Sequence, residues 1–341
     1  MDYTISNTSN QTSYQAEDDE TILQAALRNG HLYPYGCQSG ACGACKSKLI
    51  SGTVKHRSRD PEVLSDDERA GGWCLTCQAV PLEDIEIEVK EIAKVKEIEV
   101  KTLPTRVREK KLLADDVIQL FLSLPNTQTF DFLPGQYIKI LLKNGKERSF
   151  SIANTPEQAK QQGLELHVRV VPGGHYSPQV KESLKVKDII RIQGPYGTYF
   201  LRKDEDQPII MVAGGTGFAP VKGLIEDALE AGFKQPITLY WGARTEQDLY
   251  MNALAQRWEK EIPDFRYIPV LSELDASSDW QGETGFVHET IARQQTDLSK
   301  CSLYASGPPV MIEALKQALP EKGLNEDFFY TDAFDYAAQS E

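Results

Sequence analysis

Four cysteines in the first quarter of the 341-residue chain have the type and spacing to share one metal centre. Cys37, Cys42 and Cys45 form a Cys-x4-Cys-x2-Cys loop, and Cys77 follows further along. Two irons bridged by sulfides need four thiolates around a small object, and this arrangement supplies them. Glycines would let the loop wrap tightly and bring amide N–H groups near the sulfurs: Gly36, Gly40 and Gly43. The loop therefore predicts a 2Fe-2S cluster.

A zinc site is the alternative use of the same cysteines. Zinc ligands usually come as two separated Cys-x2-Cys pairs, and Cys42/Cys45 with Cys74/Cys77 can be written that way. This arrangement leaves Cys37 unexplained. Where the cytosol keeps thiols reduced, clustered cysteines are more often metal ligands than disulfides.

A glycine-rich turn later in the chain suits a phosphate group. The segment Gly214–Pro220 (GGTGFAP) directly follows an apolar strand-like run and opens an amphipathic helix. Glycines at such a turn let the backbone approach a pyrophosphate at the helix N-terminus. The candidate binding residues are Gly214, Gly215, Thr216, Gly217 and Pro220. The turn is not the Gly-x-Gly-x-x-Gly fingerprint, and such turns also occur only to reverse the chain tightly.

Two further segments could contact a flavin. Arg148-Ser149-Phe150-Ser151 offers a guanidinium for a phosphate, an aromatic ring for a ring system and a hydroxyl for a ring nitrogen. The second segment runs from His167 and Arg169 to a glycine pair that opens a helix and could present amides to a pyrophosphate. Each segment read alone would more often be an exposed strand or turn.

These residues require three structural parts. Residues 1–92 form the cysteine-containing unit, and residues 93–101 are assigned as a linker, although the charged, alternating stretch 91–101 could equally be a first strand. Many short strands within 102–203 predict an antiparallel β-barrel, with a single helix at Ser177–Leu184. From 204 to 341, apolar strands alternate with amphipathic helices, which predicts a doubly wound parallel sheet. The fold class is thus multidomain, α+β followed by α/β.

Composition narrows the setting. A net charge of −13 argues against binding nucleic acid, because phosphate backbones require clustered Lys and Arg. Such a surface fits docking to a basic protein patch better. No apolar run approaches the length that spans a bilayer, and the N-terminus lacks a basic region followed by an apolar one. We expect a cytoplasmic protein that does not bind membranes.

Taken in order, the motifs resemble the ferredoxin-NADP reductase superfamily, with a plant-type ferredoxin of β-grasp fold at the N-terminus. The flavin signature Arg-x-Tyr/Phe-Ser/Thr and the nicotinamide signature Gly-Gly-Thr-Gly-x-Ala/Thr-Pro are both met. Cys77-Gln-Ala-Val-Pro81 matches the Cys-x-Ala-x-Pro context of the fourth ferredoxin ligand. Within the superfamily, RSFSIANTP, LELHVRVVPGG, YWGARTEQDLY and FFYTDAF are similar to the CDP-6-deoxy-Δ3,4-glucoseen reductase group. Reductase components of multicomponent oxygenases share most of these motifs.

The resemblance implies a role for each matching residue. Arg148 would bind the flavin phosphate, Phe150 would pack against the flavin, and Ser151 would lie near its reactive nitrogen. Gly174 and Ser177 would hold the pyrophosphate of FAD, and the glycine-rich turn would meet the nicotinamide cofactor. Other expected cofactor contacts are Tyr137, Ser149, His167, Arg169, Gly173, Arg244, Gly307, Pro308 and Phe334. Phe334 would either cover the flavin ring or be a packed C-terminal aromatic.

One position departs from the family. The last nicotinamide-domain strand usually carries Tyr-x-Cys-Gly-Pro, with the cysteine beside the transferring hydride, whereas this chain has Tyr304-Ala-Ser306-Gly-Pro308. A hydroxyl is smaller and harder than a thiol, so we expect looser nicotinamide positioning and slower hydride transfer. Ser151 and Ser306 are therefore the residues expected nearest the chemistry. Cys301 lies outside the motif and is expected in a core strand.

Electron counting gives the expected function. A nicotinamide gives two electrons at once and a 2Fe-2S cluster accepts one, so FAD must stand between them. The acceptor would be a partner protein, either a pyridoxamine-dependent dehydrase or an oxygenase component. NADH is expected rather than NADPH, because Arg244 is the only obvious cation for a 2′-phosphate and Glu246 and Asp248 lie beside it. The alternative from another class is a non-enzymatic module that binds zinc and a nucleotide.

Overall fold

The computed structural model describes residues 2–57, 63–92, 98–174, 176–274 and 279–333. The chain divides into two compact units, residues 1–97 and residues 98–341. The second unit contains two sheets, one antiparallel and one parallel.

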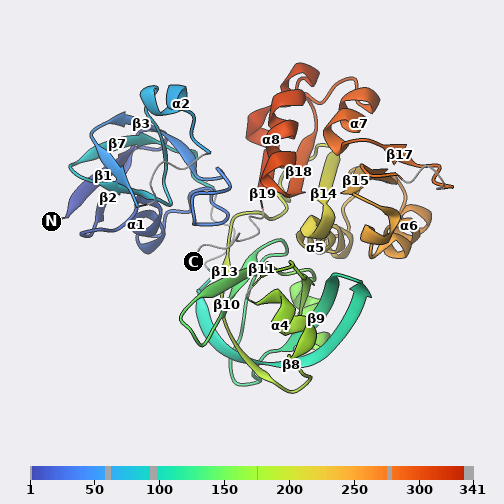
Figure 1. The fold of residues 1–341 in the computed structure, drawn as a ribbon. Coiled ribbons are helices and arrows are strands. Elements are labelled where there is room, and N and C mark those ends of the chain that lie inside the picture. The colour runs from blue at the N-terminus through green and yellow to red at the C-terminus, as the bar shows by residue number, and fades with distance from the viewer. Residues whose placement is uncertain (1, 58–62, 93–97, 175, 275–278, 334–341) are drawn as a thin grey trace. The chain divides into compact units, whose positions relative to one another are not determined.

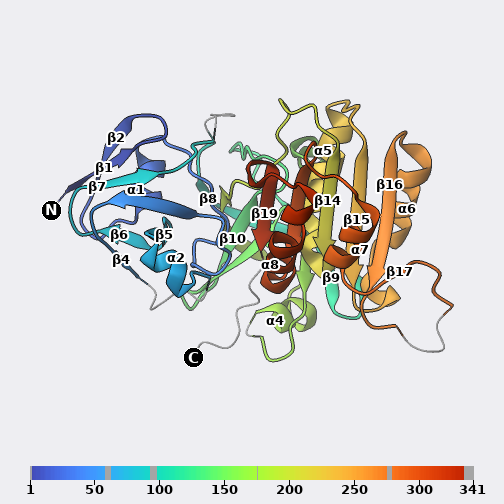
Figure 2. The same ribbon diagram turned by 90° about the horizontal axis from the view of Figure 1, so that it is seen from above.

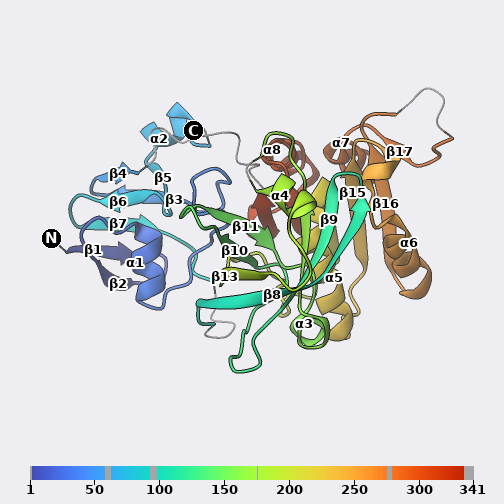
Figure 3. The same cartoon turned by 60° about the horizontal axis from the view of Figure 1, so that its bottom comes forward.

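The first unit is built on a mixed five-stranded sheet in the order β2-β1-β7-β3-β5, with a separate β4-β6 pair. Its strands are β1 Tyr3–Asn7, β2 Thr12–Ala16, β3 Lys46–Ser51, β4 Val54–His56, β5 Trp73–Leu75, β6 Ala79–Pro81 and β7 Ile85–Glu88. Helix α1 (Ile22–Arg28) lies beside β2 (Figure 3) and begins at a capping box of Thr21 and Gln24. A second capping box, Ser65 with Glu68, starts α2 (Asp66–Ala70).

The antiparallel sheet of the second unit closes into a barrel. Its strand order is β11-β10-β13-β8-β9-β12 (Figure 1), and a bridge between Ile152 and Leu166 joins the two edges. The strands are β8 Lys101–Ala114, β9 Val117–Ser123, β10 Tyr137–Leu141, β11 Glu147–Ser151, β12 Leu164–Arg169 and β13 Ile189–Tyr196. Buried aliphatic residues from every strand except β11 fill the interior, and Phe150 of β11 packs against them. Strand β8 begins at Lys101, so the strand starts where the proposed linker ends.

The barrel carries two helices rather than the single one that the sequence predicts. Helix α4 (Ser177–Glu182) lies where it was expected, and α3 (Pro156–Gln162) is additional. Thr155 caps α3 by accepting a hydrogen bond from the Gln158 amide, Pro156 occupies its first turn, and Gly163 ends it at φ 91°. These start and stop signals are local, but a segment of seven residues without an apolar stripe is easily taken for a loop.

The parallel sheet is doubly wound, as predicted. Its order is β17-β16-β15-β14-β18-β19, and every neighbouring pair is parallel. The strands are β14 Ile209–Gly214, β15 Ile237–Ala243, β16 Phe265–Leu271, β17 Glu283–Thr284, β18 Ser302–Gly307 and β19 Phe329–Ala333. Helices α7 (Val287–Gln294) and α8 (Pro309–Ala318) cover one face, and α5 (Phe218–Glu230) and α6 (Asn252–Glu261) cover the other (Figure 2).

From β14 the chain adds β15, β16 and β17 on one side of the sheet, and it then returns to add β18 and β19 on the other side. The strand order therefore reverses between β14 and β18. In such sheets a ligand binds outside the carboxyl ends of the strands at this reversal. The glycine-rich turn follows β14, and Ser306 ends β18, so both lie at that point. Cys301 does not lie in a strand: it is half-buried and precedes β18, which corrects the expectation of a core position.

Candidate functional site

The four predicted cluster ligands are arranged as two pairs. Sγ of Cys42 accepts a hydrogen bond from the Cys37 amide at 3.4 Å, and Sγ of Cys45 lies 3.2 Å from Sγ of Cys77. A hydrogen bond from Cys42 lowers the pKa of the Cys37 thiol to about 5. Over the described residues, no three His, Cys, Asp or Glu side chains form a group that could hold a single metal ion. Two thiol pairs fit two bridged irons.

The loop around these cysteines has the backbone that the glycines were expected to allow. Gly40 and Gly43 have φ of 88° and 73°, in the left-handed region, whereas Gly36 is not among the glycines with positive φ. The Gln78 side chain donates to the Gln38 carbonyl at 2.8 Å, and the Thr76 amide donates to the Cys45 carbonyl at 3.1 Å. These bonds hold the Cys77 segment against the loop.

Cys74 lies in β5 and is 1% exposed. Burial raises the pKa of its thiol to about 12, so it stays protonated. Its backbone pairs with Ser47 of β3, and it takes part in neither of the two cysteine pairs, which agrees with leaving Cys74 out of the ligand set.

Strand β11 presents the flavin motif with alternate residues on opposite sides. Ser151 is buried and pairs with Tyr137 of β10, while Phe150 is half-buried with its ring 6.1 Å from that of Tyr176. Arg148 is partly exposed, and its guanidinium donates to the carbonyl of the adjacent Glu147 at 2.7 Å. Ser149 is exposed. Arg148 and Phe150 are thus partly accessible to a ligand, whereas Ser151 is enclosed.

The glycine pair before α4 forms a tight loop. Gly173 has φ of 74°, and a Cβ on Gly174 would lie 3.0 Å from the Val171 carbonyl oxygen and 3.2 Å from Oγ of Ser177. Oγ of Ser177 accepts a hydrogen bond from the Val171 amide at 3.0 Å. A side chain at position 174 would crowd this loop, which explains the glycine.

The glycine-rich turn packs directly on the end of β18. A Cβ on Gly217 would lie 2.0 Å from the Ser306 carbonyl oxygen, and one on Gly214 would lie 2.6 Å from Sδ of Met311. Gly307 has φ of 158° and also lacks room for a Cβ. Only glycine fits here, so two strands of the reversal meet at backbone distance. Thr216 is buried within the turn, and Pro220 follows in α5.

Arg169, at the end of barrel strand β12, points at this turn. A Cβ on Gly215 would lie 3.6 Å from Nη2 of Arg169. Nε and Nη2 of Arg169 are buried and have no hydrogen-bond partner in the described structure, and its acidic neighbours Asp116 and Asp248 lie 3.5 and 3.8 Å away. A guanidinium left with unused buried donors beside a phosphate-type turn is ready to bind an anion.

Asp332 of β19 joins the two serines expected nearest the chemistry. Oγ of Ser151 donates to Oδ2 of Asp332 at 3.4 Å, and Oγ of Ser306 donates to the Asp332 carbonyl at 3.1 Å. All three residues are buried. The sequence prediction missed Asp332, although it stands two residues before Phe334 in the motif FFYTDAF. Phe334 itself lies outside the described residues.

Arg244 is already neutralised by a carboxylate. Its Nη2 donates to Oδ1 of Asp248 at 3.2 Å, and this bond raises the pKa of Arg244. Burial opposes ionisation of Asp248, but Arg244 and the Thr245 amide outweigh it and lower the pKa of Asp248. Glu246 is exposed beside them. The 2′-phosphate of an NADPH molecule bound here would compete with Asp248 for the Arg244 guanidinium.

His167 does not face a cofactor site. Its side chain is fully enclosed, Nε2 contacts Oε1 of Glu165 at 3.0 Å, and Nδ1 contacts the Tyr250 hydroxyl at 2.9 Å. Both ring nitrogens are therefore occupied by protein groups. This geometry argues against the direct cofactor contact expected for His167.

No helix among the described residues is long and apolar enough to cross a membrane.

Three domain families match the chain in the predicted order. Residues 6–82 match the 2Fe-2S iron-sulfur cluster binding domain, residues 104–200 the oxidoreductase FAD-binding domain, and residues 211–317 the oxidoreductase NAD-binding domain. The chain thus has domains for all three predicted cofactors. The zinc-binding, non-enzymatic alternative is wrong.

Relatives of similar length are reductases. The chain is 38% identical to the CDP-6-deoxy-L-threo-D-glycero-4-hexulose-3-dehydrase reductase of Yersinia pestis, over 94% of this chain and 95% of that protein. It is 34% identical to reductase component 2 of terephthalate 1,2-dioxygenase from a Comamonas species, over 92% of each. Among solved structures, the cytochrome reductase GcoB of Amycolatopsis aligns with a TM-score of 0.79 at 31% identity, covering 98% of this chain and 100% of that one.

Proposed function

This chain belongs to the iron–sulfur flavoprotein reductases of the ferredoxin-NADP reductase superfamily, and from that premise we propose that it delivers electrons from NADH to a pyridoxamine-dependent dehydrase acting on a nucleotide-linked deoxysugar. The acceptor is proposed because a dehydrase reductase is 38% identical over 94% of the chain. A second candidate acceptor is an oxygenase component, which is favoured by the 34% identity to the Comamonas dioxygenase reductase.

The chain's residues fit the three cofactors. When bound, the nicotinamide supplies two electrons as hydride, the flavin accepts both and releases them singly, and the cluster carries one at a time. Cys37, Cys42, Cys45 and Cys77 would hold the cluster, because their thiols already stand in two pairs. Their chemistry suits iron, since thiolates are its preferred protein ligands in such clusters.

The FAD would be held by the barrel. Arg148 is partly exposed and would bind the phosphate, Phe150 would lie against the ring system, and the Gly173–Gly174 loop before Ser177 would face the pyrophosphate. Glycine at position 174 keeps this loop tight, because a Cβ there would crowd the Val171 carbonyl oxygen and Oγ of Ser177. Further proposed contacts to FAD are Ser149 of β11 and Tyr137 of the neighbouring strand β10.

The nicotinamide cofactor would bind at the strand reversal. The buried Nε and Nη2 of Arg169 beside Gly215, which make no hydrogen bond within the described residues, are the observation that carries this placement, because a pyrophosphate would accept hydrogen bonds from them. It would compete there with the ion pair of Nη2 and Asp248 at 3.8 Å. Pro308 and Gly307 border the same point at the end of β18.

Ser151, Asp332 and Ser306 would orient the reacting groups. The Asp332 carboxylate accepts a hydrogen bond from Ser151 of β11, and the Asp332 carbonyl accepts one from Ser306 of β18. One residue thus links the strand of the proposed flavin contacts to the strand beside the proposed nicotinamide site. The Ser306 hydroxyl donates its proton to the Asp332 carbonyl, and the Ser306 side chain is fully buried. The expected slower hydride transfer relative to a cysteine remains a proposal.

NADH is proposed as the donor. Asp248 pairs with Arg244, and Glu246 adds negative charge, so a 2′-phosphate would meet repulsion as well as a cation already engaged. Equal turnover with NADPH and NADH would contradict this.

Two measurements test the proposal. Purified protein should show flavin and iron–sulfur absorption bands that NADH bleaches without oxygen, and a colourless protein would overturn it. The acceptor is tested by mixing the reductase and NADH with a dehydrase holding its sugar intermediate and, in parallel, with an oxygenase component. Deoxysugar formation supports the first acceptor, and coupled hydroxylation alone supports the second.

A further inference from the structure

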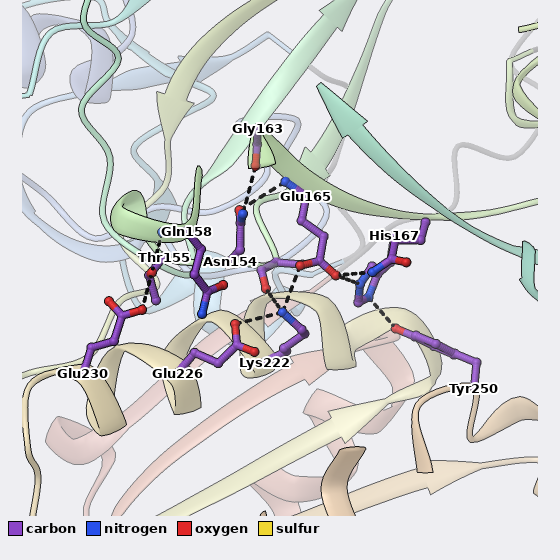
Figure 4. A network of polar contacts seen from close by, with 12 residues as sticks. Asn154, Thr155, Gln158, Gly163, Glu165, His167, Lys222, Glu226, Glu230 and Tyr250 are labelled. Carbon is purple, nitrogen blue, oxygen red and sulfur yellow. Dashed lines mark hydrogen bonds and ion pairs between the residues drawn. The ribbon is translucent and has the colours of Figure 1, made fainter. Parts of the chain in front are cut away.

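A buried polar network joins the barrel to the helix that follows the glycine-rich turn (Figure 4). Lys222 of α5 is 5% exposed, and its Nζ donates to the Ala153 carbonyl at 3.0 Å, Oε2 of Glu165 at 2.9 Å and Oε2 of Glu226 at 2.8 Å. An ammonium group has three protons, so each has an acceptor. Glu165 comes from barrel strand β12, and Ala153 lies two residues after Ser151.

Glu165 is fully engaged as well. Oε1 receives hydrogen bonds from Gln119 at 2.6 Å and from Nε2 of His167 at 3.0 Å. Burial alone would raise the pKa of Glu165, but His167 and the charge of Lys222 outweigh it and lower the pKa to about 2. Burial lowers the pKa of His167, so the ring is neutral. Its Nε2 then donates to Glu165, and its Nδ1 accepts from the Tyr250 hydroxyl.

Two further contacts attach α5 to the segment that follows Ser151. Oγ1 of Thr155 donates to Oε1 of Glu230, at the end of α5, at 2.7 Å (Figure 4). Gly223, the residue after Lys222, has no side chain, and a Cβ there would lie 3.2 Å from the Ile152 carbonyl oxygen. The helix therefore rests directly on the backbone next to the flavin serine.

The other end of the network leads to the glycine-rich turn. The Tyr250 ring meets the Trp241 ring edge-on at 5.2 Å, and Nε1 of Trp241 donates to the Gly215 carbonyl at 3.1 Å. Phe218, the first residue of α5, stacks on Trp241 at 3.8 Å and 5°. The same network thus contacts the backbone beside Ser151 and, through Trp241, the turn itself.

We propose that Lys222, with Glu165, His167 and Tyr250, is a positioning network. It fixes the glycine-rich turn Gly214–Pro220, the proposed nicotinamide site, relative to strand β11, which carries the proposed flavin contacts. This rests on the proposed placement of the two cofactors at those elements. A buried ion pair is a poor source of stability compared with apolar packing, but it imposes one geometry because each donor needs its acceptor. Hydride transfer needs reacting atoms about 3–3.5 Å apart, and a misplacement of about 1 Å can cost on the order of 100-fold.

The test compares K222M with K203M in the holoenzyme. Lys203 also pairs with a carboxylate of α5, Asp227, at 2.8 Å, but it is 49% exposed, so it is a matched control outside the network. At saturating NADH, K222M should transfer hydride on the order of 10- to 100-fold more slowly, with the NADH dissociation constant changed less than about three-fold. Rapid-mixing absorbance of the flavin, without oxygen, gives both values. K203M should match the wild type.

A second readout does not depend on activity. Hydrogen exchange of the amides in residues 214–221, measured without NADH, should speed up about ten-fold or more in K222M and remain unchanged in K203M. Wild-type transfer and exchange in K222M would overturn the proposal. So would loss of FAD from K222M with unchanged exchange in the turn, because the network would then serve flavin retention. A wild type whose flavin NADH does not bleach would instead overturn the proposed function.

K222M leaves two carboxylates without their cation, so it can fail to fold. The variants K222M/E165Q and Y250F then decide the question. The double variant removes Lys222 and one of its two carboxylate partners, so that only Glu226 loses its cation, and Y250F removes one hydroxyl while keeping the ring that packs on Trp241. K222M/E165Q or Y250F, if folded and loaded with FAD, should slow hydride transfer at saturating NADH about three-fold or more. Wild-type rates of hydride transfer in both variants would refute the positioning role.

Discussion

The cysteine loop holds its functional residues in the opposite way from the region around Lys222 where the barrel packs on α5 and the parallel sheet. We call this second region the junction. In the loop, three proposed ligands lie within nine residues, and two glycines with positive φ give the chain its shape. In the junction, Lys222 bonds to Glu165 across 57 positions, and Ser151 bonds to Asp332 across 181. A local site is built by residue type and spacing, whereas the junction exists only once a barrel and a parallel sheet have packed together.

This contrast implies different sensitivities. Removing a thiolate takes away a metal ligand and the site with it. Moving a residue of the junction leaves both cofactor-binding surfaces present but changes the geometry between them.

The C77S variant should lose the 2Fe-2S cluster and with it electron delivery to a one-electron protein acceptor. Flavin bleaching by NADH should persist, because the proposed flavin and nicotinamide residues all lie in the other compact unit. Iron content and the absorption spectrum measure the cluster. C74A is the control and should keep the cluster, since Cys74 lies in β5 and belongs to neither cysteine pair. Cluster loss in C74A but not in C77S would reverse the ligand assignment.

The R169M variant should weaken NADH binding on the order of 10- to 100-fold, which corresponds to losing a charge-assisted hydrogen bond of about 1.5–3 kcal/mol. Its limiting rate of flavin reduction should change much less, in contrast to K222M. Calorimetric titration with NAD⁺ measures the affinity directly. R108M, at a barrel arginine that bonds to the exposed Gln161 carbonyl, serves as the control. An unchanged affinity in R169M would remove Arg169 from the nucleotide site.

The H167Q variant should flatten the acid dependence of stability. Because burial lowers the pKa of His167, the folded state resists protonation that the unfolded chain accepts near pH 6.5, so the folded state is destabilised as pH falls below about 6.5. Glu165, with a lowered pKa, contributes stability that is lost only between about pH 4.5 and 2. Glu226, with a raised pKa, has the opposite sign but is common to both proteins.

Urea midpoints at pH 7.5 and 5.5 measure this dependence. The drop between the two should be smaller in H167Q than in the wild type by about 1 kcal/mol. H288Q changes a histidine outside the network and should keep the wild-type drop. A wild-type drop in H167Q would mean that His167 takes up its proton equally in the folded and the unfolded chain.

The S306C variant should raise the limiting rate of hydride transfer about two- to five-fold, an effect of about 1 kcal/mol or less. The larger, softer thiol would hold the nicotinamide more closely than the hydroxyl. A primary isotope effect with NADH deuterated at the transferred position shows whether this step limits the rate. Slower transfer would instead show that the Ser306 bond to Asp332 matters more.

By itself, the sequence determined the parts that depend on local spacing. The Cys-x4-Cys-x2-Cys loop, the glycine turn after β14 and the alternation of strands and helices could all be read from neighbouring residues. Helix α3 was missed although its cap and proline are equally local, because it lacks an apolar stripe.

Only the tertiary structure decided the partners of Asp332, Lys222 and His167. In sequence these are an aspartate near the C-terminus, a lysine in an amphipathic helix and a histidine in a strand, and periodicity reports only how each lies within its own element. Their partners depend on how the barrel closes and which face of α5 rests on it. For that reason His167 was expected at a cofactor and instead lies in the junction, where a buried ring needs an acceptor and a donor that only distant segments supply.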